Sequence, residues 1–167
     1  MLLYTILITI NHTVIILEAV CLDDNKNKQY KEKLTMTEST LELFSNFKVT
    51  LNDYTATAFN IGTYMSACKT ALDNETKEQF KQSIRKTINE EIELEKSLDD
   101  YIIALIDEFK LYKEIKNAIE SLRKTSYNAG KAHYIYGRQE EYERLQSVFN
   151  EDHNALLNMM EKELEHV

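Results

Sequence analysis

Apolar side chains recur every three or four residues along most of the chain, which is the spacing of one face of an α-helix. The first such pattern runs from about Tyr30 to Ala71. A turn signal follows at Leu72 to Glu78, where Asn74 is a candidate cap for the next helix. The apolar positions of the first pattern are Leu34, Leu41, Phe44, Phe47, Leu51, Tyr54, Ala58, Ile61 and Met65.

The second helical pattern is unusually long and runs from about Glu75 to about Tyr136. Its apolar seam repeats at about 3.5 residues, which favours coiled-coil packing. A helix of about sixty residues would span about 90 Å at 1.5 Å per residue, too long for a compact small domain. We therefore expect a partner to cover the seam, and a second copy of the chain is the simplest one. The seam positions are Ile84, Ile88, Leu94, Leu98, Ile102, Leu105, Phe109, Tyr112, Ile115, Ile119 and Leu122.

A third helical pattern runs from about Glu140 to the end of the chain. The reversal before it is predicted at Gly137 to Gln139, because Gly supplies the backbone angles that turns require. With no Pro and three Gly in 167 residues, the chain has few turns. The patterns together predict an all-α fold, a long antiparallel coiled coil of three helices over residues 30–167. The apolar positions of the third pattern are Leu145, Val148, Phe149, Leu156, Met159, Met160 and Leu164.

Residues 1–22 are strongly apolar but are interrupted by Asn11, His12 and Glu18. The segment lacks the positively charged start of a signal peptide. It is just long enough to span a membrane, although polar residues inside a span are costly. A signal or anchor, a membrane-associating helix and an extension from an upstream start site all remain open. Residues 23–29 are predicted to be a polar linker.

The charge of the chain is unevenly distributed. The formal net charge of −8 argues against a general nucleic-acid binder, which needs a basic surface. Residues 110–138 nevertheless hold seven Lys and Arg side chains against Glu114 and Glu120. A one-signed stripe of this kind, nearly free of acids four residues away, is either a binding surface or an ordinary solvated face. Its members at multiples of seven, which a supercoiled helix would align, are Lys110, Lys124, Lys131 and Arg138.

Three stretches resemble the BAR domains of amphiphysin-like proteins, a family that includes short fungal endocytic members. Ser97 to Tyr101 (SLDDY) resembles the PLDNY-type segment in the second helix of that family. Arg123 to Tyr134 (RKTSYNAGKAHY) resembles another run of the family, with one residue fewer. Glu143 to Leu164 is similar to its third-helix pattern.

The resemblance implies a crescent-shaped dimer of three-helix coiled coils that binds anionic membranes and senses or induces their curvature. A cytoplasmic role in endocytosis or cortical actin organisation would follow, with a second copy or another BAR protein as partner and no nucleic acid. Between His133 and Gln146 this chain is shorter than the family, which has a Lys-rich tip there. The side chains expected to contact lipid phosphate and serine headgroups are Lys110, Lys113, Lys124, Lys131 and Arg138.

Motifs that carry catalytic or metal chemistry are sparse. Cys21 and Cys68 do not form a CxxC pair, and Glu163-x-x-His166 lacks the second such motif and the extra carboxylates of a di-iron site. The sequence has no phosphate-binding Gly loop and no Ser-centred elbow. We therefore expect neither enzyme activity nor a cofactor. The alternative to the membrane function is a coiled-coil interaction or tethering protein, or a secreted helical bundle, with no lipid role.

Overall fold

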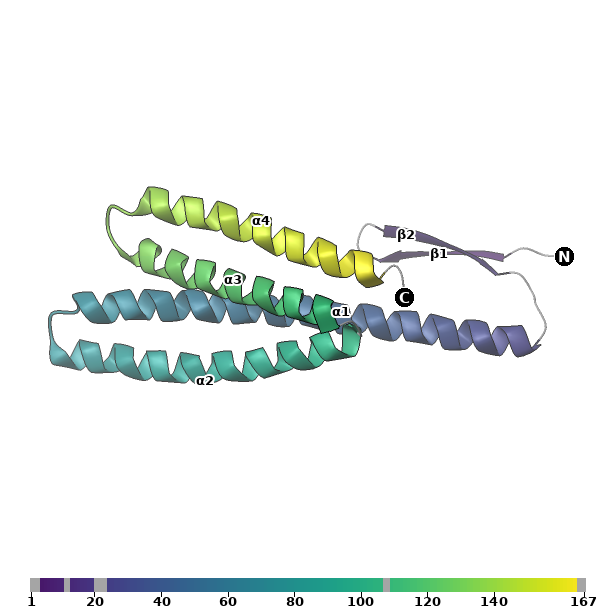
Figure 1. The fold of residues 1–167 in the computed structure, drawn as a ribbon, viewed down its shortest axis with the longest axis horizontal. Helices are drawn as coiled ribbons and strands as arrows, with labels where there is room; N and C mark the ends of the chain where they lie inside the picture. The colour runs from purple at the N-terminus through teal and green to yellow at the C-terminus, as the bar shows by residue number, and fades with distance from the viewer. Residues whose placement is uncertain (1–3, 11–12, 20–23, 107–108, 165–167) are drawn as a thin grey trace. The chain divides into compact units, whose positions relative to one another are not determined.

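The computed structural model describes residues 4–10, 13–19, 24–106 and 109–164. The chain divides into two compact units, residues 1–39 and residues 40–167, and one long helix crosses the boundary. The elements follow in the order β1 (Tyr4–Ile10), β2 (Thr13–Ala19), α1 (Asp24–Thr70), α2 (Asn74–Leu105), α3 (Phe109–Tyr134) and α4 (Gln139–Leu164) (Figure 1).

The first unit contains an antiparallel pair of strands, in which Tyr4 pairs with Ala19 and Ile10 with Thr13. Both strands are rich in Ile, Val and Thr, whose β-branched side chains favour extended backbone. Residues 4–10 and 13–19 are therefore strands, and not part of the membrane-associating helix that was considered for this segment. Residues 24–29 of the predicted linker lie in α1. Within the described ranges, no helix is long and apolar enough to cross a membrane.

Every regular element described in the second unit is a helix, which confirms the all-α prediction for this part of the chain. Successive helices run in opposite directions, and α1 and α3 lie between α2 and α4 (Figure 1). All four helices contribute to one apolar core, because each presents a face of apolar residues at helical spacing. The largest fully buried side chains are Phe47, Leu51, Tyr54, Leu98, Ile102, Ile115, Leu122, Leu156 and Met160.

The single helix predicted from Glu75 to Tyr136 is wrong, because the structure has two helices there. Helix α2 ends at Leu105, and its C-cap Ile106 has extended backbone with φ −128° and ψ 115°. Helix α3 then runs back alongside α2 (Figure 1). The structure therefore has four helices instead of the predicted three, because α2 and α3 replace the long second one. Most of the seam that was expected to need a second chain is buried within this one.

The other two turns lie close to their predicted places. Asp73, and not Asn74, caps α2, since its carboxylate accepts a hydrogen bond from the Thr76 backbone N at 2.7 Å. The predicted reversal at Gly137 is confirmed, and this glycine has φ +83°, a conformation that favours Gly.

Helices α1 and α3 pack at unusually close range. A Cβ atom added to Gly62 would overlap the carbonyl oxygen of Tyr127, and one added to Gly130 would overlap that of Phe59. The Ser126 hydroxyl donates to the carbonyl oxygen of Thr55 on the opposite helix at 2.7 Å. Backbones can approach this closely only where side chains are absent or small. Gly130 lies inside α3 and forms part of this contact.

Candidate membrane-docking face of helix α3

Helix α3 is the basic element of an acidic chain. It carries six Lys and Arg side chains against two Glu, a net charge of +4, whereas the whole chain has −8. The neighbouring α4 has two basic against seven acidic side chains, a net charge of −5. Because α3 is basic and the helix packed beside it is acidic, positive and negative side chains lie on different parts of the unit's surface. A local basic face can therefore coexist with a negative net charge of the whole chain.

Three of the predicted lysines share the solvent side of α3. Lys124 and Lys131 follow Lys113 by 11 and 18 residues, close to three and five whole turns at 3.6 residues per turn. Lys113 and Lys124 are exposed, while Lys131 is half-buried with its ammonium 5.3 Å from the centre of the Tyr127 ring. Lys110 is also exposed and lies one turn before Lys113. We call these four residues the α3 lysine row.

Arg138 does not belong to the row. It follows the end of α3, and its carbonyl oxygen accepts the first hydrogen bond of α4 from the Tyr142 N at 3.0 Å. Its guanidinium donates to Glu141 at 3.2 Å. The alignment predicted from multiples of seven fails here because the chain turns before it reaches Arg138.

The prediction that the stripe is nearly free of acids four residues away is also wrong. Lys110 lies 3.8 Å from Glu114, and Lys124 lies 3.5 Å from Glu120, each pair one turn apart. All four side chains are about half exposed or more. Exposed pairs of this kind contribute only about 0–1 kcal/mol, so an external anion readily replaces the acid.

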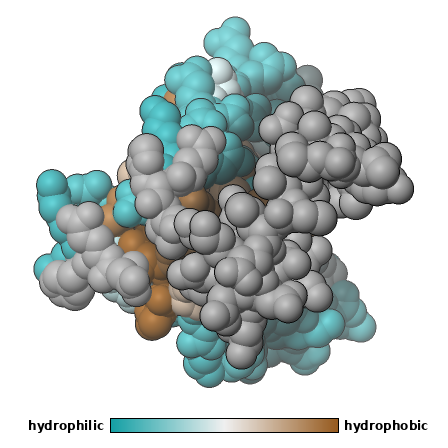
Figure 2. Space-filling view, turned by 90° about the vertical axis from the view of Figure 1, so that its right-hand side faces the viewer, coloured by the Kyte–Doolittle hydropathy of each residue, from teal (hydrophilic) through white to brown (hydrophobic). Residues whose placement is uncertain are grey.

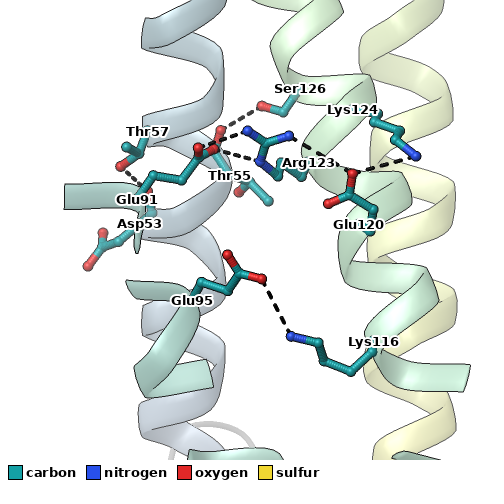
Figure 3. A network of polar contacts seen from close by, with 10 residues as sticks. All are labelled: Asp53, Thr55, Thr57, Glu91, Glu95, Lys116, Glu120, Arg123, Lys124 and Ser126. Carbon is teal, nitrogen blue, oxygen red and sulfur yellow. Dashed lines mark hydrogen bonds and ion pairs between the residues drawn. The ribbon is translucent and has the colours of Figure 1, made fainter. Parts of the chain in front are cut away.

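Two basic residues of α3 point inward to α2 (Figure 3). Arg123 donates two hydrogen bonds of 2.8 Å to the carboxylate of Glu91, whose side chain is only 7% exposed. Lys116 contacts Asp99 and also lies 3.7 Å from Glu95. Sequence reasoning missed these pairs, although the acids at intervals of four residues on α2 were a readable signal of a charged helix face.

The surroundings of Lys116 and Arg123 stabilise the charged forms of these side chains, and those of Tyr54 stabilise its neutral hydroxyl. The hydrogen bond to Glu91 raises the pKa of the Arg123 guanidinium. Burial opposes the charged form of Lys116, but the hydrogen bond and charge of Asp99 outweigh it and raise its pKa. Burial, followed by the charge of Glu95, raises the pKa of the nearby Tyr54 hydroxyl. The side chains of Lys116 and Arg123 therefore form ion pairs with α2. Among the basic side chains of α3, only the α3 lysine row faces the solvent.

Other chemistry finds little support among the described residues. They contain no group of three or more His, Cys, Asp or Glu side chains that could hold a metal ion. Cys68 is a free thiol whose Sγ lies 3.7 Å from the Lys77 carbonyl oxygen. A groove of about 350 Å³ between α1, α3 and α4 is lined mainly by small and aromatic side chains, with Phe59 and Phe149 among them. Position 166 of the Glu163-x-x-His166 pair lies outside the described residues.

No family model, curated protein or solved structure matches the chain. The resemblance to BAR domains therefore stays a prediction. The structure places its first stretch, 97–101, on α2 and its second, 123–134, on α3. The resemblance implied one long helix through this region, whereas these two helices run antiparallel (Figure 1).

Proposed function

We propose that the second unit is a non-catalytic docking module that binds anionic membranes through the α3 lysine row. The observation that supports this function is a row of outward lysines on the basic helix of an otherwise acidic chain. Lysines near an anionic leaflet contribute about 1 kcal/mol each at low salt. Four such residues would give weak, reversible and salt-sensitive attachment.

The form of the row favours a membrane over a small soluble anion. Lys113 and Lys131 are 18 residues apart, which corresponds to about 27 Å along the helix. A small anion is usually bound in a concave site with converging donors, whereas a straight row suits a flat, charged surface. The negative total charge does not prevent this contact, because charges more than about 8 Å away are largely screened at physiological salt.

The proposal concerns attachment and not membrane shape. The crescent implied by the BAR resemblance depends on a helix of about sixty residues, and α2 has 32 residues. A role in endocytosis or at the cell cortex would follow from attachment to the cytoplasmic leaflet.

The test is co-sedimentation of the full chain with vesicles that contain phosphatidylserine, at low and at high salt, beside neutral vesicles. We expect pelleting with anionic vesicles that high salt abolishes. The triple variant Lys113→Glu, Lys124→Glu, Lys131→Glu should stay in the supernatant.

A second triple variant separates position from total charge. Lys69, Arg144 and Lys162 are exposed and lie outside α3. Their replacement by Glu changes the net charge by the same amount and should leave most of the pelleting intact. Equal loss in both variants, or no pelleting of the wild type at low salt, would reject the lysine row. An interaction or tethering role without lipid would then be the better account.

A further inference from the structure

Helix α2 exposes a row of large apolar side chains. Ile88, Ile92 and Ile103 are 39%, 44% and 63% exposed, whereas five of the other seven isoleucines of the unit are buried. Hydrophobic surface reaches the solvent beside hydrophilic surface in the described part of the molecule (Figure 2). Exposed isoleucines that follow one another along a helix are typical of an interaction surface.

The two halves of α2 carry opposite charges. Residues 74–89 have four Lys and Arg against two Glu, a net charge of +2, and residues 90–105 have six Asp and Glu against Lys96, a net charge of −5. Ion pairs with two basic residues of α3 reduce the second value to −3. The surface of α2 is therefore basic in its first half and acidic in its second, and such a helix suits a partner with the opposite order of charge.

The exposed isoleucines lie on one face of α2 together with charged residues. The members of this face, which we call the seam, are three or four residues apart, and three of the seven are apolar while four are charged. Ile92 lies at its centre, with three members on each side. The seam consists of Lys81, Arg85, Ile88, Ile92, Lys96, Asp99 and Ile103.

We infer that this seam pairs with the same seam of a second copy of the chain, antiparallel, about a twofold axis at Ile92. Antiparallel pairing places the basic half of each α2 against the acidic half of the other, and the symmetry makes this contact twice. A parallel pair would instead bring like charges together. The inference concerns a different surface from the α3 lysine row and does not depend on the proposed membrane function.

The position of the twofold axis at Ile92 determines which residues of the two copies face each other. Arg85 precedes Ile92 by as many residues as Asp99 follows it, so Arg85 lies level with Asp99 of the second copy, which is already paired with Lys116 of its own chain, and beside the exposed Asp100. Neither Arg85 nor Asp100 has an ion-pair partner among the described residues of its own chain. Ile88 lies level with the aliphatic stem of Lys96 of the second copy, which can cover it while its ammonium stays in water.

The test is a charge exchange followed by sedimentation velocity of the full chain. Arg85→Glu and Asp100→Arg each place like charges together twice in a dimer, so each variant alone should dimerise at least about tenfold more weakly than the wild type. An equimolar mixture of the two variants restores an opposite pair at both contacts. We expect the mixture to form a heterodimer of nearly wild-type affinity. A mixture that stays monomeric, or a wild-type chain that is monomeric throughout, would overturn the inference.

A second pair of variants tests the apolar part of the seam. Ile92→Glu should abolish the dimer, whereas Val49→Glu, at a somewhat more exposed position on α1, should leave it intact. Circular dichroism of both variants shows whether the fold is retained. A dimer that survives Ile92→Glu in a folded chain would place the interface elsewhere.

Discussion

The most consequential single contact is the bidentate pair between Glu91 and Arg123. Removal of the arginine leaves a carboxylate with almost no access to water, and the loss of one partner of such a pair typically costs about 3–5 kcal/mol. We therefore expect Arg123→Met to lower the free energy of unfolding by about 3 kcal/mol in urea titrations, near the lower limit because Arg123 is one-third exposed. Lys124→Met, which removes an exposed pair one residue away, should change it by less than about 1 kcal/mol.

A second variant decides whether the charge or the shape of the Glu91–Arg123 pair matters. Glu91→Leu combined with Arg123→Met removes both charges and should recover much of the loss, since no unpaired group remains buried. A double variant as unstable as Arg123→Met alone would mean that packing, and not charge pairing, stabilises this site.

Gly62 tests the close approach of α1 and α3. Replacement of a helical Gly by Ala ordinarily stabilises by about 1 kcal/mol. Here the added Cβ meets the Tyr127 carbonyl oxygen, so Gly62→Ala should instead destabilise the fold by about 1–3 kcal/mol in thermal or urea unfolding. Asn46→Ala, on the exposed side of α1, should be neutral or slightly stabilising. The close helix contact would be disproved by a stabilising Gly62→Ala.

At the scale of elements, Asp73 makes the start of α2 sensitive to pH. The hydrogen bond from the Thr76 backbone lowers the pKa of Asp73, so its carboxylate stabilises the helix above the unfolded-state pKa of about 4. That contribution is lost as the pH falls through the lower folded-state pKa.

The melting temperature should therefore fall in Asp73→Ala at pH 7, with a difference from wild type that shrinks below about pH 4. Asp73→Ser keeps a capping oxygen without a titrating group, and its cap should be independent of pH in this range. A difference between Asp73→Ala and wild type that stays constant down to pH 2 would contradict the role of the carboxylate.

Sequence periodicity predicted some elements and missed others for a clear reason. The end of α1 and the start of α4 have distinct turn signals, and both lie within one residue of their predicted places, whereas α1 begins six residues earlier than predicted. The break after Leu105 has neither Gly nor Pro, and the apolar spacing continues across it to Tyr112. The reversal depends on burial of residues from both helices in one core, a long-range effect that local patterns do not contain. The one local signal was the acidic pair before Phe109, which is typical of a helix start.

The sequence also predicted only part of the candidate site. The outward positions of Lys113 and Lys124 follow from helical spacing alone. The inward positions of Lys116 and Arg123 depend on acids of α2 that face them only after the chain reverses (Figure 3). Arg138 was misplaced because the same local pattern was extended past the end of α3.

For the whole helical unit, the central claim is that α2 and α3 are separate antiparallel helices. Every later step depends on it, since the reversal turns Lys116 and Arg123 inward and leaves the α3 lysine row and the α2 seam on the surface. The alternative is the continuous helix that the sequence pattern predicts.

A distance measurement decides between these two arrangements most directly. Spin labels at Gln82 and Asn128, both exposed, would be introduced after Cys21 and Cys68 are replaced by Ser, with excess unlabelled chain to suppress distances between copies. Antiparallel packing predicts a separation of about 20 Å, set by an interaxial distance of about 10 Å and the label arms. A separation of about 70 Å, the length of a continuous helix between these residues, would contradict the account.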